Sequence, residues 1–233
     1  MLYCYLKTTP KAKAKVNFRL FSYFLTILGL FFVANAVFPI FLYKLKSFRF
    51  SKSVLVSPVE SSYNFYNDYS NYNSNYNNYR NWFSAVPQLP THPSKITHYN
   101  LSIPKLKIES AIVTIGGEDL SESLIQYPGT ALPGEYGNTV IFGHSVLPQF
   151  FNPKNYKTIF STLPTLEEGD EILIDFDGVR YRYVVFKMIE VSPKDVSVLE
   201  QRYDGEYLSL VTCVPPGTYL RRLIVRAKLV KPS

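Results

Sequence analysis

The stretch Glu171-Ile-Leu-Ile-Asp-Phe-Asp-Gly-Val-Arg-Tyr-Arg-Tyr-Val-Val-Phe186 has the pattern of a β-hairpin. A short, mainly apolar run ends near Asp177-Gly178, a dipeptide that favours a two-residue turn between antiparallel strands, and the residues from Arg180 to Phe186 alternate between polar and apolar. Short runs of the same kind extend from Tyr99 to the C-terminus, and helical periodicity is confined to turns near 156–163 and 194–199. This texture predicts an all-β fold, a single and mostly antiparallel barrel with short helices. The other predicted strands cover residues 101–108, 138–142, 207–214 and 222–230.

The composition limits the class of protein. A chain of 233 residues allows one domain with appendages, and 46% hydrophobic residues exclude wholesale disorder. Lys and Arg number 25 against 18 Asp and Glu, a net charge of +7 that suits an anionic membrane surface or nucleic acid and selects neither. The two cysteines, Cys4 and Cys213, cannot form a disulfide framework, and no Cys/His cluster indicates zinc. We therefore predict no metal and no cofactor.

Residues 20–43 carry no charge. At about 1.5 Å per residue a helix of this length extends about 36 Å, enough to cross a hydrocarbon layer of about 30 Å. Ala34-Asn35-Ala36 offers an alternative, because it resembles a signal-peptidase site. The chain stays apolar as far as Tyr43, so we favour an uncleaved signal-anchor with a cytoplasmic N-terminus. In either case the rest of the chain is predicted to lie outside the cytoplasm.

A segment rich in Tyr and Asn, residues 63–81, follows the predicted span and contains no aliphatic residue. It cannot bury a core of its own, and we interpret it as a polar stalk rather than a self-associating or glycan-facing segment. The predicted organisation is a basic N-terminus at 1–19, a signal-anchor at 20–43, a Tyr/Asn- and Pro-rich linker at 44–98 and the barrel at 99–233.

Three residues in the predicted barrel are candidates for chemistry. His144 follows an apolar run and Gly143, whereas His92 and His98 lie in or beside the Pro-rich linker and are expected to be solvated. Cys213 ends a strand-like run before a turn-rich loop, and Arg221-Arg222 opens the last predicted strand. A lone His is often structural and a lone Cys is often a small buried hydrophobe. If the last two strands pair, however, Cys213 and one of the arginines lie at the same end of the barrel.

Such a trio would suit acyl transfer. A thiolate can attack a peptide carbonyl, an imidazolium can lower the thiol pKa and protonate the leaving amine, and a guanidinium can bind the developing oxyanion. The intermediate would be a thioester, which water or an amine could resolve.

The segments Asn138-Thr-Val-Ile-Phe-Gly-His144, Leu166-Glu-Glu-Gly-Asp-Glu-Ile172, Leu208-Ser-Leu-Val-Thr-Cys213 and Arg222-Leu-Ile-Val-Arg-Ala227 together resemble the sortase family of membrane-anchored cysteine transpeptidases. The resemblance extends over about residues 103–229. It implies a closed barrel of about eight strands, an LPxTG-like sorting signal on surface proteins as substrate, and a thioester passed to an amine such as a cell-wall precursor or a pilin lysine.

The resemblance also implies the roles of individual residues. It places the nucleophile on Cys213, the catalytic His on His144 and the essential Arg on Arg222, because Arg222-Leu-Ile-Val fits the family's order of Arg, aliphatic residues and Val. Arg221 is the fallback. Thr212 stands where the family commonly has Thr before the nucleophile, which implies support of the substrate or the oxyanion.

The subtype is expected to be one that anchors surface proteins rather than a pilus polymerase. No lid motif is evident, although Trp82-Phe83 is placed to pack near a cleft. Some sortases bind calcium through acidic loops, and Glu167, Glu168 and Asp170 are candidates, but Leu-Glu-Glu-Gly-Asp reads equally as a turn before a strand.

Two other functions stay open: a thiol peptidase that releases its product to water, and an inactive barrel that binds cell-surface polymer or protein through the Tyr/Asn segment. Nucleic-acid binding is disfavoured, because the basic residues are dispersed and the domain is predicted to be exported.

Overall fold

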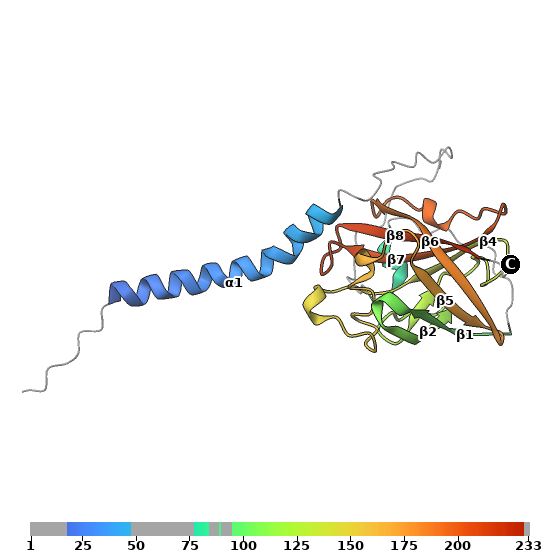
Figure 1. Cartoon of the computed structure of the whole chain (residues 1–233), viewed down its shortest axis with the longest axis horizontal. Coiled ribbons are helices and arrows are strands. Elements are labelled where there is room, and N and C mark those ends of the chain that lie inside the picture. The colour runs from blue at the N-terminus through green and yellow to red at the C-terminus, as the bar shows by residue number, and fades with distance from the viewer. Residues whose placement is uncertain (1–17, 48–76, 84–88, 90–94, 231–233) are drawn as a thin grey trace, which may run out of the picture. The chain divides into compact units, whose positions relative to one another are not determined.

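The computed structural model describes residues 18–47, 77–83, 89 and 95–230, and the predictions on His92, on Cys4 and on most of the 44–98 linker lie outside these ranges. The chain divides into two units, residues 1–41 and residues 42–233. The first unit holds most of a single long helix, and the second contains the barrel (Figure 1).

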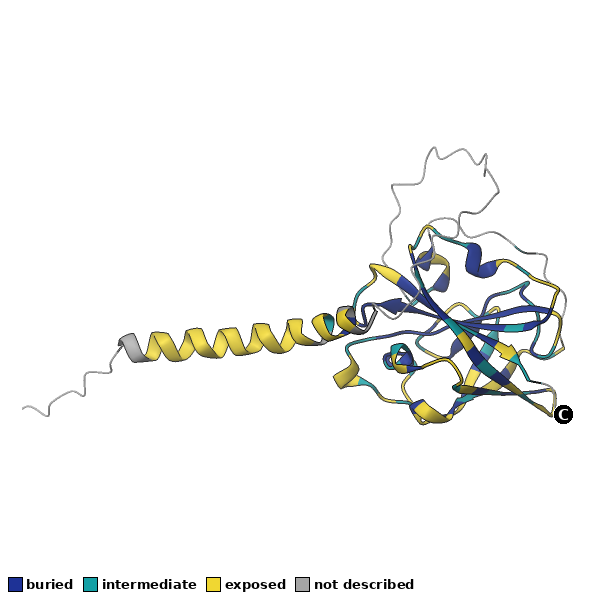
Figure 2. Ribbon diagram, turned by 45° about the horizontal axis from the view of Figure 1, so that its top comes forward, coloured by how far each residue is buried: buried dark blue, intermediate teal, exposed yellow. Residues whose placement is uncertain are grey.

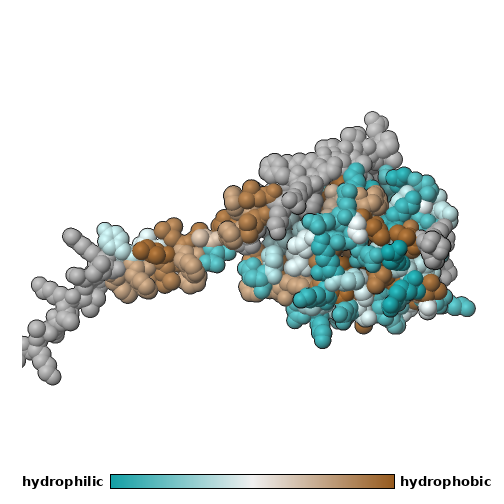
Figure 3. All heavy atoms as spheres, in the orientation of Figure 1, coloured by the Kyte–Doolittle hydropathy of each residue, from teal (hydrophilic) through white to brown (hydrophobic). Residues whose placement is uncertain are grey.

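Helix α1 (Phe18–Ser47) covers the predicted signal-anchor. Its segment Phe21–Tyr43 has a mean hydropathy of 2.3 and is long and apolar enough to cross a membrane. Its apolar side chains are exposed along most of its length, in contrast to the barrel, whose strands carry most of the buried residues (Figures 2 and 3). A helix that is apolar on all sides is suited to lipid rather than to water.

Eight strands close into a barrel in the order β1-β2-β3-β4-β7-β8-β6-β5, as the fold prediction required. Two neighbouring pairs, β2 with β3 and β4 with β7, are parallel, and the other six pairs are antiparallel. Five short 3-10 helices lie in the described connections: η1 (Tyr79–Trp82), η2 (Pro104–Leu106), η3 (Pro148–Phe150), η4 (Leu163–Thr165) and η5 (Ser197–Leu199). The strands are β1 (His98–Ile103), β2 (Ile108–Ile115), β3 (Leu124–Gln126), β4 (Gly137–Phe142), β5 (Glu171–Phe176), β6 (Val179–Val191), β7 (Glu206–Val214) and β8 (Arg221–Leu229).

The predicted hairpin is confirmed as the pair β5 and β6, with Phe176 opposite Val179. Asp177 and Gly178 both have positive φ, 51° and 74°. A two-residue hairpin turn of the I′ type requires this conformation at both of its central residues. The turn therefore sets the register of the whole pair.

The prediction of one strand over 101–108 is wrong. The chain bends at η2, where Pro104 begins a 3-10 turn and Lys107 takes a left-handed conformation with φ of 56°. Strand β1 ends before this turn and β2 begins after it, so the alternating run contains a hairpin. The short strand β3 was not predicted at all, because three buried residues give no periodic signal.

The two faces of the strands belong to two different cores. Side chains from all eight strands, including Leu208, Leu210 and Val214 of β7, fill the barrel interior. The alternate residues Val211 and Cys213 belong to a second buried cluster with aromatic residues of the 77–83 segment. Since successive strand side chains point to opposite faces, Cys213 lies on the outer face of the barrel under this second cluster.

Replacing Gly178 with Ala tests the turn. Nothing lies within 4 Å of the position a Cβ would take, so the only cost is the positive φ. We expect a loss of about 1 kcal/mol in the free energy of unfolding, measured by urea denaturation. Asp177→Asn is the control and should change it by less than about 0.5 kcal/mol, because Asn tolerates this conformation. Equal effects of the two substitutions would contradict the assignment.

Candidate active site

Strand pairing brings the three predicted residues to one end of the barrel. In the parallel pair of β4 and β7, Phe142 stands opposite Val211, and His144 and Cys213 each follow two residues later. In the antiparallel pair of β7 and β8, Cys213 stands directly opposite Arg222. The Cβ atoms of directly opposed residues lie about 5 Å apart on the same face, so the thiol and the guanidinium are neighbours.

The loop that carries His144 is tied to the end of β7 from both sides of the histidine. Thr212 Oγ1 donates to the carbonyl of Gly143 at 2.7 Å, and Ser145 Oγ donates to the carbonyl of Cys213 at 2.6 Å. The carbonyl of His144 itself accepts from the backbone N–H of Phe160 at 2.9 Å. These bonds fix the backbone on which the imidazole is mounted.

Thr212 lies on the face of β7 opposite to Cys213, and its hydroxyl is already used by Gly143. This geometry favours a role in holding the histidine loop over the direct support of substrate or oxyanion that the resemblance implied. Gly143 is needed for close packing, because an added Cβ would lie 2.5 Å from the Phe160 ring and 2.6 Å from Leu124.

The segment Asn77–Phe83 lies against the three residues. Asn77 Oδ1 is 3.2 Å from His144 Nε2, and the rings of Trp82 and His144 have centroids 5.6 Å apart. Trp82 is fully buried. The three site residues are almost fully buried, with exposed fractions of 1% for Cys213, 8% for His144 and 3% for Arg222. Trp82 and Phe83, which the sequence analysis expected near a cleft, pack against Cys213, His144 and Arg222.

The two arginines have different environments. The Nε and Nη2 groups of Arg222 donate to the carbonyl of Trp82 at 3.0 and 2.6 Å, and Nη1 donates to the carbonyls of Tyr219 and Arg221 at 3.0 and 3.2 Å. Arg221 is exposed and pairs with Glu190 at 2.5 Å. In the described part of the chain, the partners of the Arg222 guanidinium are thus carbonyl oxygens, the kind of atom on which an oxyanion develops.

A comparison with known proteins identifies the family. The Sortase domain profile matches residues 101–230, more than half of the chain. The chain belongs to the sortase family. Sortases are cysteine transpeptidases, so family membership indicates an enzyme.

Relatives and solved structures agree with this assignment. The chain is 28% identical to Sortase D of Bacillus subtilis over 134 residues, which are 56% of this chain and 62% of that relative. It is 26% identical to Sortase A of Streptococcus agalactiae over 132 residues, which are 56% of this chain and 52% of that relative. The match therefore spans less than two thirds of these relatives.

The structural neighbours include a Clostridium perfringens Sortase D5 transpeptidase, with a TM-score of 0.50 and 27% identity over 62% of this chain and 83% of that one. Sortase A from Corynebacterium diphtheriae has a TM-score of 0.52 and 28% identity, and the match covers 61% of this chain and 64% of that one.

Burial holds both candidate catalytic groups of this sortase in their neutral forms. It raises the pKa of the Cys213 thiol to about 11, although nearby Arg222 acts to lower it. Burial also lowers the pKa of His144 to about 4, partly offset by the charge of Asp119 and reinforced by that of Lys157. In the covered site, burial therefore opposes transfer of the proton from the Cys213 sulfur to the His144 imidazole.

Sequence reasoning missed the polar neighbours of the histidine. Asn77 came from the predicted stalk, and Asp119 lies in the connection between β2 and β3, where it pairs with Asn78 in an isolated antiparallel bridge. Neither residue carries a recognisable signal in the sequence, since the role of each depends on contacts between distant segments. His98 lies at the exposed start of β1, beside Thr97, as expected for a solvated residue.

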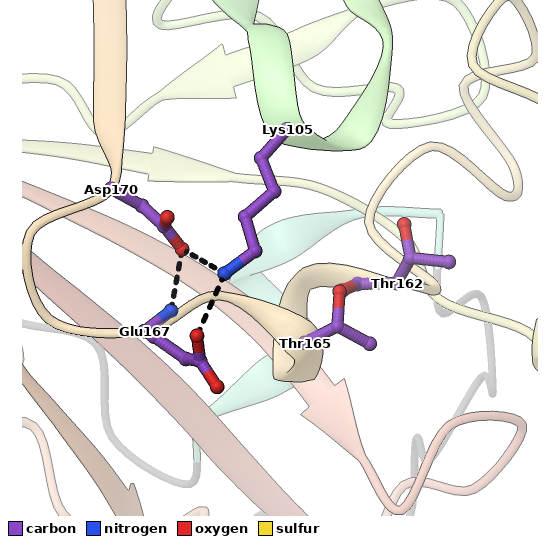
Figure 4. A network of polar contacts seen from close by, with 5 residues as sticks. All are labelled: Lys105, Thr162, Thr165, Glu167 and Asp170. Atoms are coloured by element: carbon purple, nitrogen blue, oxygen red, sulfur yellow. Dashed lines mark hydrogen bonds and ion pairs between the residues drawn. The ribbon is translucent and has the colours of Figure 1, made fainter.

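The acidic loop considered for calcium holds an internal cation. The ammonium group of Lys105 lies 3.1 Å from a Glu167 oxygen and 2.8 Å from an Asp170 oxygen, and Asp170 also accepts from the backbone N–H of Glu167 at 2.6 Å (Figure 4). Across the residues that the structure describes, no group of three or more His, Cys, Asp or Glu side chains is arranged to hold a metal ion. Lys105 stands in the place that a cation would need.

We expect the stability of the barrel to fall as the pH drops from about 6.5 to about 4. The unfolded His144 takes up a proton near 6.5, whereas in the folded protein it does so only near 4, so protons favour unfolding in this window. The loss attributable to His144 should be on the order of 3 kcal/mol. Urea denaturation across this range should show a shallower pH dependence for His144→Gln, with His98→Gln as the matched control. An unchanged slope in His144→Gln would rule out this linkage.

We also expect millimolar calcium to leave the melting temperature of the protein unchanged within about 1 °C, because the Lys105 ammonium already bridges the two carboxylates. Lys105→Met should cost less than about 1 kcal/mol, as is usual for exposed ion pairs, and calcium should recover part of that loss. Thermal denaturation with and without calcium measures both effects, with Lys107→Met as control. A rise of several degrees in the parent protein would show that a calcium site forms despite Lys105.

Proposed function

We propose that this protein is a membrane-anchored sortase that cleaves an LPxTG-like sorting signal and transfers the acyl part to an amine. The observation that carries the proposal is the convergence of Cys213, His144 and Arg222 at one end of the barrel, together with the membership of the sortase family. An apolar helix that can serve as an anchor precedes the barrel.

The proposed reaction begins with transfer of the thiol proton to the imidazole. The Cys213 sulfur then attacks the scissile carbonyl carbon, and the carbonyl oxygen, now negative, takes hydrogen bonds from Arg222. His144 gives its proton to the leaving amine as the C–N bond breaks, which leaves a thioester on Cys213. An incoming amine attacks this thioester, loses a proton to His144, and the sulfur departs to recover its own proton. Each proton is returned, so the enzyme is regenerated.

The supporting geometry is electrostatic as well as positional. A guanidinium that is buried and hydrogen-bonded to neutral carbonyls keeps its charge available for an oxyanion. The hydrogen bonds from Thr212 and Ser145 hold the histidine loop beside the thiol. The substrates would be surface proteins with a C-terminal sorting signal, and the acceptor an amine such as a cell-wall precursor or a pilin lysine.

The test uses the full chain in detergent micelles with a panel of LPxTG-like peptides and an added amine. Mass spectrometry should find an acyl group on Cys213 and, with amine present, a product that contains it. Cys213→Ala should abolish both, His144→Ala should lower the rate by about 10²–10⁴, and Arg222→Ala by about 10²–10³. Arg221→Ala is the matched control and should retain most of the activity.

The alternatives give different products. A thiol peptidase would form the acyl-enzyme but release only the free acid, whatever the amine concentration. An inactive surface-binding barrel would form no acyl-enzyme in a folded sample, and Cys213→Ala would leave its binding unchanged.

A further inference from the structure

Arg226 on strand β8 is a half-buried cation that the proposed mechanism does not use. Its neighbours Val225 and Ala227 belong to the barrel interior, so Arg226 lies on the outer face. Four residues separate it from Arg222 on the same face, a distance of about 13 Å along the strand. Between the two arginines lies Ile224, which is fully buried in the second cluster. Arg226 is therefore separate from the candidate active site.

The guanidinium of Arg226 has a different environment from that of Arg222, which donates to backbone carbonyls. The Nε of Arg226 is buried, and no described residue accepts a hydrogen bond from it. Burial lowers the pKa of Arg226, and so does the charge of Arg202. A guanidinium nitrogen that is buried without an acceptor is costly, because it loses water and gains no partner. Such a group in a folded protein indicates a bound ion or an ordered water at that position.

The neighbouring strands decide between an ion and a water. Strands β6, β8 and β7 lie side by side, and Arg226 stands directly opposite Lys187 of β6 and Ser209 of β7 (Figure 1). Directly opposed residues have Cβ atoms about 5 Å apart, and two like charges at that separation repel each other. A water molecule leaves this repulsion in place, whereas an anion between the two side chains removes it. The pairing of Arg226 with Lys187 therefore favours an anion.

Two further cations lie next to this pair. Lys228 follows Arg226 on the outer face of β8, and Arg202 comes from the connection between β6 and β7. Both cations lie over the ring of Tyr207, 5.6 Å from its centroid for Arg202 and 5.8 Å for Lys228. Both are exposed, as is Phe186, whose ring centroid is 6.1 Å from that of Tyr207. Solvent can therefore reach the pair from this side.

Three carboxylates in the connection between β6 and β7 lie close by, and none of them pairs with Arg226. Asp204 is already paired with Arg202 at 2.6 Å, and Asp195 accepts a hydrogen bond from a backbone N–H of its own turn at 3.0 Å. Asp195 and Glu200 act on Arg226 through their charge, but neither forms an ion pair with it in the described part of the chain. Four cations face three carboxylates, so the surface stays positive.

We propose that Arg226 and Lys187 form a binding site for a phosphate group, with Arg202 and Lys228 at its entrance. A guanidinium presents paired N–H donors that match phosphate oxygens, and an ammonium group beside it adds a second charge. A phosphate group has enough oxygens to accept from cations on two strands at once. The group is either free phosphate or the headgroup phosphate of an anionic lipid, to which a chain with a membrane-spanning helix has access. The proposal does not depend on transpeptidase activity.

Titration of the full chain with inorganic phosphate tests the site. The protein is held in neutral detergent micelles at physiological ionic strength, and isothermal titration calorimetry measures the Kd. We expect saturable binding in the millimolar range or tighter. Arg226→Gln should weaken it at least about tenfold and Lys187→Gln about three- to tenfold, because each removes a charged hydrogen-bond donor. Glu200→Gln should tighten it, because a competing carboxylate is lost.

Lys154→Gln is the matched control, since it removes one positive charge from an exposed residue in the connection between β4 and β5. Its Kd should equal that of the parent protein. Phosphate should also raise the melting temperature of the parent, because a ligand that binds only the folded state stabilises it, and should have less effect on Arg226→Gln. The absence of saturable binding, or equal Kd values in the parent, Arg226→Gln and Lys187→Gln, would overturn the proposal. If Arg226→Gln does not fold, the comparison with Lys187→Gln decides.

A second titration identifies the source of the phosphate group. Glycerophosphoglycerol, the headgroup of phosphatidylglycerol without its acyl chains, replaces inorganic phosphate in the same set of variants. A Kd below that of inorganic phosphate, with the same dependence on Arg226, assigns the site to a lipid headgroup. A Kd equal to or above it assigns the site to free phosphate. Failure of both ligands to bind would refute the site altogether.

Discussion

The parallel pairing of β4 with β7 is the constraint on which the site depends. It aligns the ends of two strands that are far apart in the sequence, so that His144 and Cys213 leave the barrel at the same level. The antiparallel partner β8 then places Arg222 opposite the cysteine. Because side chains alternate along a strand, a shift of one residue in either register would turn one of these groups into the barrel interior. The hydrogen bonds from Thr212 and Ser145 add a second lock, since they tie the histidine loop to the β7 end.

Burial is the second constraint. A guanidinium, imidazole or thiolate without hydrogen-bonding partners is costly to bury in an apolar cluster. Two features of the site reduce this cost. The thiol and the imidazole are neutral, and the guanidinium keeps its charge by donating to four carbonyl contacts, two of them to Trp82. The segment Asn77–Phe83 supplies part of this burial: the Trp82 carbonyl accepts from Arg222, and the Trp82 ring packs beside His144.

The acidic loop before β5 shows how one side chain changes the chemistry of a site. Carboxylates that could attract a divalent cation are instead bridged by the ammonium of Lys105, which comes from the turn between β1 and β2 (Figure 4). The interaction is largely exposed and adds little stability, but it joins two connections of the barrel that are distant in the sequence.

The sequence by itself determined the features that depend on local pattern. The Asp177-Gly178 turn, the alternating strands around it, the uncharged helix and the identity of Cys213, His144 and Arg222 as candidates all follow from neighbouring residues. The tertiary structure decided the rest. The break at Lys107, the short strand β3, the bond of Thr212 to Gly143 and the cover formed by Asn77–Phe83 depend on which distant segments meet. Trp82 shows the difference most clearly: its apolar character was readable in the sequence, but the hydrogen bonds of its backbone carbonyl to Arg222 exist only because the folded barrel brings β8 to it.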